Sequence, residues 1–572
     1  MPGPALSHTA TALEVGIADP NSIRVSSSQP VGPTMQEFDY VVVGAGSAGC
    51  VVAARLSESG RYSVVLIEAG GEDGQFWVEA PLGFGKLYNS PELNWTYESE
   101  SEAGLGGLRS YQPRGKLLGG TGSINGMVYM RGRPEDYDQW RELGNIGWGY
   151  DDVLPFFKRS EDNCRGADSF RGAGGPITVV DGPRHELGAA FIAAAEACGF
   201  GRTADHAGAK HDGFGVAQMT IRKGQRSSSS TGYLRPARKR PNLRVITTAL
   251  ATRLVIARGV ATGVEYRSGD QRAIVFARKE VIVCAGAFNT PQLLQISGLG
   301  PAGLLQDNGI PVRADLPGVG EGLEDHFGVN MVFRCKRPIT ITDEVRNPLR
   351  RLAMGLQYIA LRRGSVATHG TYCTGYVRSK PGLLRPDGHI SMVGWARAGN
   401  GRSETGFGLV DYPAFSLTTS ILQPESRGSV RIKSPDAAIP PEIRFNFFQS
   451  ERDHETLLGV LRIARRIVAT DPMRGHVSEE TLPGASIQSD AELLAFCRDY
   501  GRSTHHAAGS CKMGTGPNAV VDRRLRVRDI GGLRIVDASI MPTMVCGNIN
   551  APVVMIAEKG AAMILEDAQG SS

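Results

Sequence analysis

The pattern of hydrophobic positions predicts a strand, a helix and a second strand where the ordered chain begins. Residues 38–44 (FDYVVVG) form a β-branched run that ends in glycine, and residues 50–57 (CVVAARLS) continue with the apolar spacing of a helix. Residues 63–68 (SVVLIE) form the second strand-like run. A β-α-β beginning indicates a parallel sheet with a ligand at the carboxyl ends of its strands.

Further β-branched runs are spread along the chain, at residues 243–247, 253–257, 280–284 and 533–537. The segments between them contain polar loops, alternating stretches and a helix-like run at 456–470. We therefore predict an α/β protein in which a second domain interrupts the first. The predicted boundaries give one domain from residues 37–159, 221–329 and 505–566 and the other from 160–220 and 330–504.

The two chain ends lack the periodicity of folded elements. Residues 1–36 are rich in Ser, Thr, Pro and Ala and are expected to be a disordered extension. Residues 567–572 are expected to be a flexible tail.

Composition and charge exclude several classes of protein. The 63 basic and 58 acidic residues leave a net charge of only +5, which does not indicate a nucleic-acid partner. The nine cysteines are scattered and form no C-x-x-C pair, so we expect reduced thiols, no metal site and a cytoplasmic protein. No stretch approaches the roughly 18 apolar residues of a membrane span, and we see no signal peptide.

Residues 44–49 (GAGSAG) match the G-x-G-x-x-G pattern of dinucleotide-binding loops, with a strand before them and a helix after them. Gly44 permits the tight turn, Gly46 lets the backbone approach a pyrophosphate, and Gly49 permits close helix packing. Glu68 ends the next strand, where its carboxylate can accept hydrogen bonds from ribose hydroxyls. The pattern alone does not separate NAD from FAD, but sheet strands that return near the C-terminus favour a large prosthetic group.

Two longer segments resemble the signatures of the glucose-methanol-choline (GMC) oxidoreductase family. They are residues 114–132 (RGKLLGGTGSINGMVYMRG) and 286–300 (GAFNTPQLLQISGLG), and the resemblance covers residues 37 to 566. It implies a Rossmann-like FAD-binding domain of the GMC type and an inserted substrate-binding domain built on an antiparallel sheet with helices. Some members attach the flavin through a histidine directly before the asparagine of the first signature. Ile124 occupies that position here, so the resemblance implies non-covalently bound FAD.

The glycine loop, Glu68 and the family signatures together predict the cofactor site. In the family, the segment around Asp537 passes the FAD phosphates and ribityl chain, and its carboxylate could accept a ribityl hydroxyl or orient backbone donors. The residues expected to bind FAD are Gly44, Gly46, Ser47, Ala48, Gly49, Glu68, Ala69, Gly119, Gly120, Asn125, Gly126, Met127, Val128, Asp537, Ala538 and Asn548.

Residues 503–514 (STHHAAGSCKMG) resemble the family segment that carries the active-site histidine. Family members place that histidine three residues before a glycine, and His506 meets this spacing with Gly509, whereas His505 does not. A neutral imidazole can accept the hydroxyl proton of an alcohol near physiological pH. The resemblance therefore assigns His506 as the catalytic base.

The partner of His506 is expected in residues 547–552 (GNINAP). The family places His or Asn ten residues before the helix position that Glu558 holds here, which selects Asn548. Asn550 is the weaker candidate and is expected to shape the turn or contact the flavin. Asn548 would hold the alcohol oxygen, so that the carbon faces flavin N5 for hydride transfer.

The resemblance predicts an FAD-dependent enzyme that oxidises a small-molecule primary alcohol to an aldehyde. Residues 422–431 (LQPESRGSVR) resemble the choline-dehydrogenase branch, but His505 stands where choline would favour an aromatic phenol. The electron acceptor, oxygen or a quinone or dye, stays open, as does the oligomeric state. The family scaffold also leaves two alternatives, a hydroxynitrile lyase and a light-driven fatty-acid decarboxylase.

Overall fold

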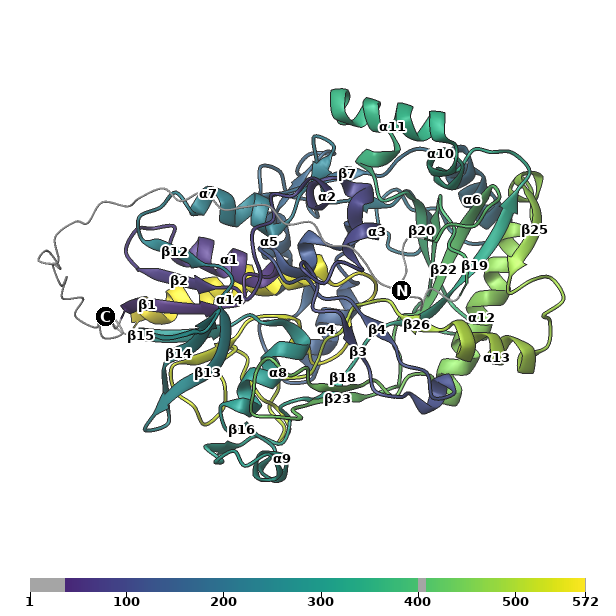
Figure 1. The fold of residues 1–572 in the computed structure, drawn as a ribbon. Helices are drawn as coiled ribbons and strands as arrows, with labels where there is room; N and C mark the ends of the chain where they lie inside the picture. The colour runs from purple at the N-terminus through teal and green to yellow at the C-terminus, as the bar shows by residue number, and fades with distance from the viewer. Residues whose placement is uncertain (1–35, 400–407, 571–572) are drawn as a thin grey trace, which may run out of the picture. The chain divides into compact units, whose positions relative to one another are not determined.

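The computed structural model describes residues 36–399 and 408–570 (Figure 1). The predicted N-terminal extension therefore lies outside the described residues, except for residue 36. From Gln36 onward the chain is one compact unit. The predicted division of this unit into two domains stays a prediction.

The first sheet has seven strands in the order β12-β2-β1-β15-β14-β13, with β27 paired to β15. Their bounds are Leu243–Ile246 for β12, Val64–Ile67 for β2, Gln36–Val43 for β1, Gln271–Val283 for β15, Val260–Ser268 for β14, Leu250–Ala257 for β13 and Leu533–Ile535 for β27. The pairs β12–β2, β2–β1, β1–β15 and β15–β27 are parallel, whereas β13, β14 and β15 are joined in antiparallel register. The predicted parallel sheet and α/β class are confirmed, and every predicted strand run overlaps a strand of this sheet.

Two helices from opposite ends of the sequence pack beside this sheet (Figure 1). Helix α1 (Ser47–Leu56) follows the glycine loop, and α14 (Asn550–Gly570) contacts both α1 and α5 (Tyr150–Ser160). Both α1 and α14 are buried over most of their length because their side chains are mainly small or aliphatic. The C-terminal helix α14 thus packs against the helix that follows the N-terminal glycine loop.

The prediction of a flexible tail is wrong for residues 567–570, because helix α14 continues to Gly570. Asp567 accepts hydrogen bonds from the guanidinium groups of Arg534 and Arg526, at 2.6 and 2.5 Å, and pairs with Arg524 at 2.8 Å. These ion pairs fix the last turns of the helix to β27 and to the loop that precedes it.

The second large sheet is antiparallel, in the order β25-β19-β22-β21-β20-β8, with β26 paired to β19. Its strands are Val477–Leu482 (β25), Phe327–Cys335 (β19), Ala414–Ile421 (β22), Gly388–Val393 (β21), Thr371–Val377 (β20), Gly213–Gly215 (β8) and Arg502–Ser503 (β26). Helices α12 (Glu451–Val468) and α6 (Glu186–Ala197) pack against it. Helix α12 includes most of the helix-like run predicted at 456–470.

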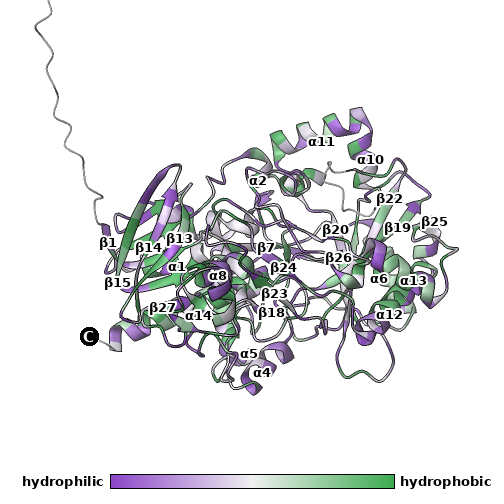
Figure 2. Cartoon of the chain, turned by 60° about the horizontal axis from the view of Figure 1, so that its bottom comes forward, coloured by the Kyte–Doolittle hydropathy of each residue, from purple (hydrophilic) through white to green (hydrophobic). Residues whose placement is uncertain are grey.

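Helix α11 (Pro348–Leu361) differs from the buried helices because it carries hydrophobic and hydrophilic residues side by side on an exposed surface (Figure 2). Leu349 is 78% exposed and Ile359 is 65% exposed. Across residues 36–399 and 408–570, no helix combines the length and hydropathy needed to cross a bilayer. All nine cysteines lie in these ranges, and each is a free thiol.

Candidate active site

A large cavity extends from the glycine loop after β1 to the antiparallel sheet, so that residues of both sheets line it. Gly44 and Gly46 lie along it, as do Thr371 of β20 and Thr418 of β22. Of the residues predicted from the sequence, all except Gly49 and Gly119 line the cavity: Gly44, Gly46, Ser47, Ala48, Glu68, Ala69, Gly120, Asn125, Gly126, Met127, Val128, His506, Asp537, Ala538 and Asn548. Residues predicted from motifs far apart in the sequence therefore share one cavity.

The glycine loop has the backbone that its sequence requires. Gly44 has a φ of +93°, and a Cβ there would lie 2.7 Å from the carbonyl oxygen of Cys284. A Cβ at Gly49 would lie 1.8 Å from the carbonyl oxygen of Gly44, so Gly49 serves helix packing. Helix α1 begins after Gly46 with no acidic residue in its first turn and no side-chain cap. Its first backbone N–H groups can therefore bind a phosphate.

Glu68 follows β2 directly and closes the glycine loop. Its carboxylate accepts hydrogen bonds from the backbone N–H groups of Ala45 and Gly70, both at 2.8 Å. Burial raises the pKa of Glu68 to about 7, and the two N–H donors oppose that shift. Its predicted contact with a ribose stays a prediction.

Asp537 connects the second signature to the C-terminal segment. Its Oδ2 accepts hydrogen bonds from the backbone N–H of Gly286 (2.8 Å) and the hydroxyl of Thr290 (2.6 Å). Its Oδ1 accepts from the backbone N–H and the hydroxyl of Ser539, at 2.8 and 2.6 Å. The carboxylate therefore accepts from two backbone N–H groups and two hydroxyls, and its predicted roles toward FAD stay predictions.

The first signature depends on an arginine that the sequence analysis missed. Asn125 Oδ1 accepts hydrogen bonds from the backbone N–H of Met127 (3.0 Å) and from Arg226 Nη1 (2.8 Å). Arg226 also donates to the carbonyl oxygens of Val78 (2.9 Å) and Asn125 (2.7 Å), and burial lowers its pKa to about 10. Nothing in the sequence relates Arg226 to Asn125, because about a hundred residues separate them.

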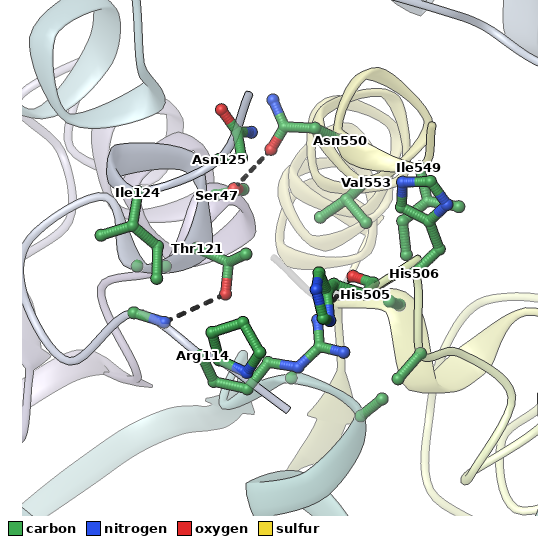
Figure 3. A pocket seen from close by; sticks show the side chains of 18 of the residues that line it. Ser47, Arg114, Thr121, Ile124, Asn125, His505, His506, Ile549, Asn550 and Val553 are labelled. Carbon is green, nitrogen blue, oxygen red and sulfur yellow. Dashed lines mark hydrogen bonds between the residues drawn. The ribbon is translucent and has the colours of Figure 1, made fainter. Parts of the chain in front are cut away.

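His506 and Asn548, the predicted catalytic pair, lie in contact. Asn548 Nδ2 is 2.9 Å from His506 Nε2, and both residues line the cavity. Figure 3 shows His505 and His506 on one side of the cavity, with Asn125 and Ile124 across from them. The backbone N–H of His506 donates to Asp325 Oδ1 at 2.8 Å, which fixes the loop that carries the histidine.

The hydrogen bonds around His506 define its tautomer. His326 Nε2 lies 3.0 Å from the carbonyl oxygen of Leu422, which only accepts, so this nitrogen carries the proton. In neutral His326 the other nitrogen, Nδ1, is then an acceptor, and it lies 3.0 Å from His506 Nδ1. His506 therefore donates from Nδ1 and presents the lone pair of Nε2 to Asn548 and the cavity.

Burial also determines the charge of these two imidazoles. Burial lowers the pKa of His506 well below its usual range, and the neighbouring His326, His505 and Arg114 lower it further. Burial lowers the pKa of His326 to about 4. Both rings are thus neutral near pH 7, and His506 is in the form that accepts a proton.

Three supporting side chains escaped the sequence analysis: Asp325, His326 and Thr504, whose hydroxyl lies 2.9 Å from His506 Nδ1. The signal that could have found two of them is the ionisable run at 324–326 (EDH), directly before the apolar strand β19. Asn550, the weaker candidate, accepts a hydrogen bond from the Ser47 hydroxyl at 2.7 Å (Figure 3). It joins the start of α14 to the start of α1.

Comparisons with known proteins identify the family to which the chain belongs. The family described as GMC oxidoreductase matches residues 38–328 and 424–557. An oxygen-dependent choline dehydrogenase of Vibrio vulnificus is 39% identical over 535 residues, which cover 93% of this chain and 94% of that protein. The pyridoxine 4-oxidase structure from Mesorbium loti has a TM-score of 0.83 and 31% identity, covering 92% of this chain and 98% of that one. A variant of Aspergillus oryzae formate oxidase has a TM-score of 0.87 and 25% identity, covering 94% and 99%.

The parallel sheet with its glycine loop, the cavity lined by His506 and Asn548, and the similar proteins define an FAD-dependent oxidoreductase that acts on CH–OH donors. The chain belongs to the GMC oxidoreductase family, and its sequence is choline dehydrogenase-like over most of its length.

Proposed function

We propose that the protein oxidises a primary alcohol to an aldehyde, with His506 as the base and Asn548 as the residue that orients the alcohol. The observation that carries the proposal is the hydrogen-bond chain from Leu422 O through His326 to His506, which makes His506 Nε2, beside Asn548, the nitrogen that accepts a proton. A base of this kind contributes roughly 10²- to 10⁴-fold to the rate.

The cavity suits an elongated dinucleotide cofactor held without a covalent bond. The uncapped start of α1 offers N–H donors for phosphates, and Gly120, whose Cβ would lie 2.7 Å from Gly46 Cα, keeps the wall flat. Ile124, at the position of the family's tethering histidine, has no nucleophilic atom. Bound FAD would supply the hydride acceptor at flavin N5.

The protein's own groups would act on the hydroxyl. Asn548 would donate its amide N–H to the alcohol oxygen and so direct the hydroxyl proton at His506 Nε2. The forming imidazolium would keep its Nδ1–H bond to His326, and the neutral state of His326 permits this.

The choline dehydrogenase and the pyridoxine oxidase among the similar proteins have names that imply oxidation of an alcohol group. Those names do not decide between oxygen and a quinone or dye as the acceptor for this chain. A cytoplasmic location, inferred from composition and thiols, and a two-domain organisation stay part of the proposal.

The test is anaerobic single-turnover reduction of the flavin by a panel of primary alcohols, followed by admission of air. The proposal expects the wild type to bleach and His506→Ala to keep its FAD but lose roughly 10²- to 10⁴-fold in the reduction rate. Fast recolouring in air would identify oxygen as an acceptor. A yellow wild-type protein that no alcohol bleaches would refute the proposal and favour the lyase or the photodecarboxylase.

A further inference from the structure

Two arginines line the cavity on the side of the antiparallel sheet. Arg502 lies on β26, four residues before His506, and its strand pairs with β19 at Gly328. Arg397 follows β21 and also lines the cavity. Among the described residues, neither a carboxylate nor a hydrogen-bond acceptor lies within bonding distance of the Arg502 guanidinium, although this residue is only partly exposed.

The surroundings of Arg502 disfavour its protonated, charged form. Burial lowers the pKa of Arg502 to about 10, and the nearby positive charge of Arg397 lowers it further. A guanidinium with such a pKa is still protonated at pH 7. A buried cation without a partner is unfavourable, and an anion that enters the cavity would relieve it.

No acidic side chain of the described residues lines this end of the cavity. The acidic side chains that line it within the described residues are Glu68 and Asp537, and both bind backbone N–H groups at the predicted cofactor end. A quaternary ammonium substrate such as choline would therefore meet Arg502 with no carboxylate beside it among the described lining residues. A carboxylate, in contrast, matches the planar fork of a guanidinium.

The walls beside these arginines are aromatic. Tyr88 and His505 form an edge-to-face pair with their ring centroids 5.7 Å apart, and the charges of Arg502 and Arg397 act on both rings. Phe84 packs against Trp395 with a centroid distance of 5.7 Å. Flat side chains of this kind favour a planar ligand between them.

We propose that the substrate is a primary alcohol that carries a carboxylate on a planar, aromatic body, with Arg502 binding the carboxylate while His506 and Asn548 receive the CH₂OH group. This inference rests on the proposed function, since it assumes that the cavity oxidises an alcohol. Arg502 is then the residue that selects for charge, and Tyr88 and Trp395 contact the ring.

The experiment compares three alcohols of similar shape: 4-(hydroxymethyl)benzoate, 4-methylbenzyl alcohol and the 4-trimethylammoniomethyl derivative of benzyl alcohol. Anaerobic flavin reduction gives a rate and an apparent affinity for each. The wild type is expected to prefer the carboxylate. Arg502→Gln should lower its kcat/KM about 10- to 100-fold, because a hydrogen bond to a charged group contributes about 1.5–3 kcal/mol, and should leave the neutral alcohol within about 3-fold. Arg502→Lys should keep part of the preference.

Binding of a carboxylate to the cavity can also be measured directly, without turnover. Titration of the oxidised holoenzyme with benzoate, read from the flavin spectrum, should give tighter binding to the wild type than to Arg502→Gln. Arg498→Gln, which changes an exposed arginine of α13 (Asp490–Tyr500), is the matched control and should alter neither readout.

The remaining outcomes overturn either the inferred substrate class or the proposed function. A wild type that oxidises the neutral or cationic alcohol at least as well as the carboxylate would overturn the substrate class and leave the proposed function standing. Equal losses for all three alcohols in Arg502→Gln would also overturn it, since they would show that Arg502 acts on the flavin. Failure of all three to bleach the flavin, in a wild type that no other alcohol bleaches, would refute the proposed function itself.

Discussion

The two ends of the cavity are built in different ways. At the cofactor end, short contiguous motifs supply backbone groups, and the acids Glu68 and Asp537 are satisfied by N–H donors within the loops that they close. At the proposed substrate end, single side chains arrive from separate strands, and the cation of Arg502 has no partner among residues 36–399 and 408–570. The first end is complete as a scaffold, whereas the second holds a charge that a ligand would neutralise.

This contrast shows where each kind of specificity resides. A shape made by glycine backbone tolerates no added side chain, so its residues are fixed by sterics. A charge pattern made by side chains can change by one substitution without disturbing the fold. We therefore expect substitutions at the cofactor end to remove the cofactor, and substitutions at the substrate end to alter which alcohol reacts.

The largest effect is expected from Gly49→Ala. Its Cβ would lie 1.8 Å from the carbonyl oxygen of Gly44, so α1 would have to move away from the loop. We expect a protein without bound flavin, measured as the ratio of visible to protein absorbance after purification. Gly71→Ala, where a Cβ meets nothing within 4 Å, is the control and should stay yellow. Normal flavin content in Gly49→Ala would contradict the claim that steric constraints fix the residues of the cofactor end.

A smaller effect is expected from His326→Gln, which acts through His506. The substitution weakens the acceptor for His506 Nδ1–H, and loss of a bond to a charged group predicts an alcohol-dependent flavin reduction about 10-fold slower, with FAD content unchanged. Below its own pKa of about 4, protonated His326 repels a charged His506 and so lowers the pKa of His506, and the substitution removes this repulsion. Because the base must be neutral, activity should then begin to fall at a higher pH during acidification.

The measurement for this variant is the pH profile of flavin reduction, compared with His454→Gln on α12, where the ring bonds to the Phe448 carbonyl outside the cavity. An unchanged acid limb with a lower rate at every pH would show a packing effect in place of the proposed positioning role.

The smallest effect is expected from Ser47→Ala at the cofactor end. It removes the 2.7 Å hydrogen bond to Asn550 Oδ1 and leaves the backbone of the loop intact. One such bond contributes about 1 kcal/mol, so the dissociation constant of FAD should rise by no more than about 5-fold. Ser57→Ala, at the other end of α1, is the control. A loss as large as that of Gly49→Ala would contradict the view that backbone shape dominates here.

Much of the cofactor end could be predicted from the sequence because its determinants are local. The glycine spacing around Gly44, the strand before it and the helix after it lie within one short segment, and β1, α1 and β2 follow the predicted pattern. His506 and Asn548 were selected by motif spacing, and the structure brings their side chains to 2.9 Å. Their catalytic roles stay a prediction until the flavin is reduced by an alcohol.

The helical end of the chain was predicted wrongly for a physical reason. Residues 567–570 carry no hydrophobic periodicity, but Asp567 pairs with Arg534 and Arg524, which are more than thirty residues away in sequence. Ion pairs between residues far apart in the sequence produce no periodic pattern along it, so the sequence alone does not reveal them.

The sequence by itself determined the family, the α/β class and the glycine loop, and it selected the proposed catalytic pair, because these depend on backbone conformation and on motifs within short segments. Only the tertiary structure decided which nitrogen of His506 faces the cavity, since that depends on a hydrogen-bond chain through His326 to Leu422. It also decided that Arg502 and Arg397 line the same cavity. Charges from different strands act together only after the sheet has formed, because electrostatic interactions depend on distance in space and not on separation along the chain.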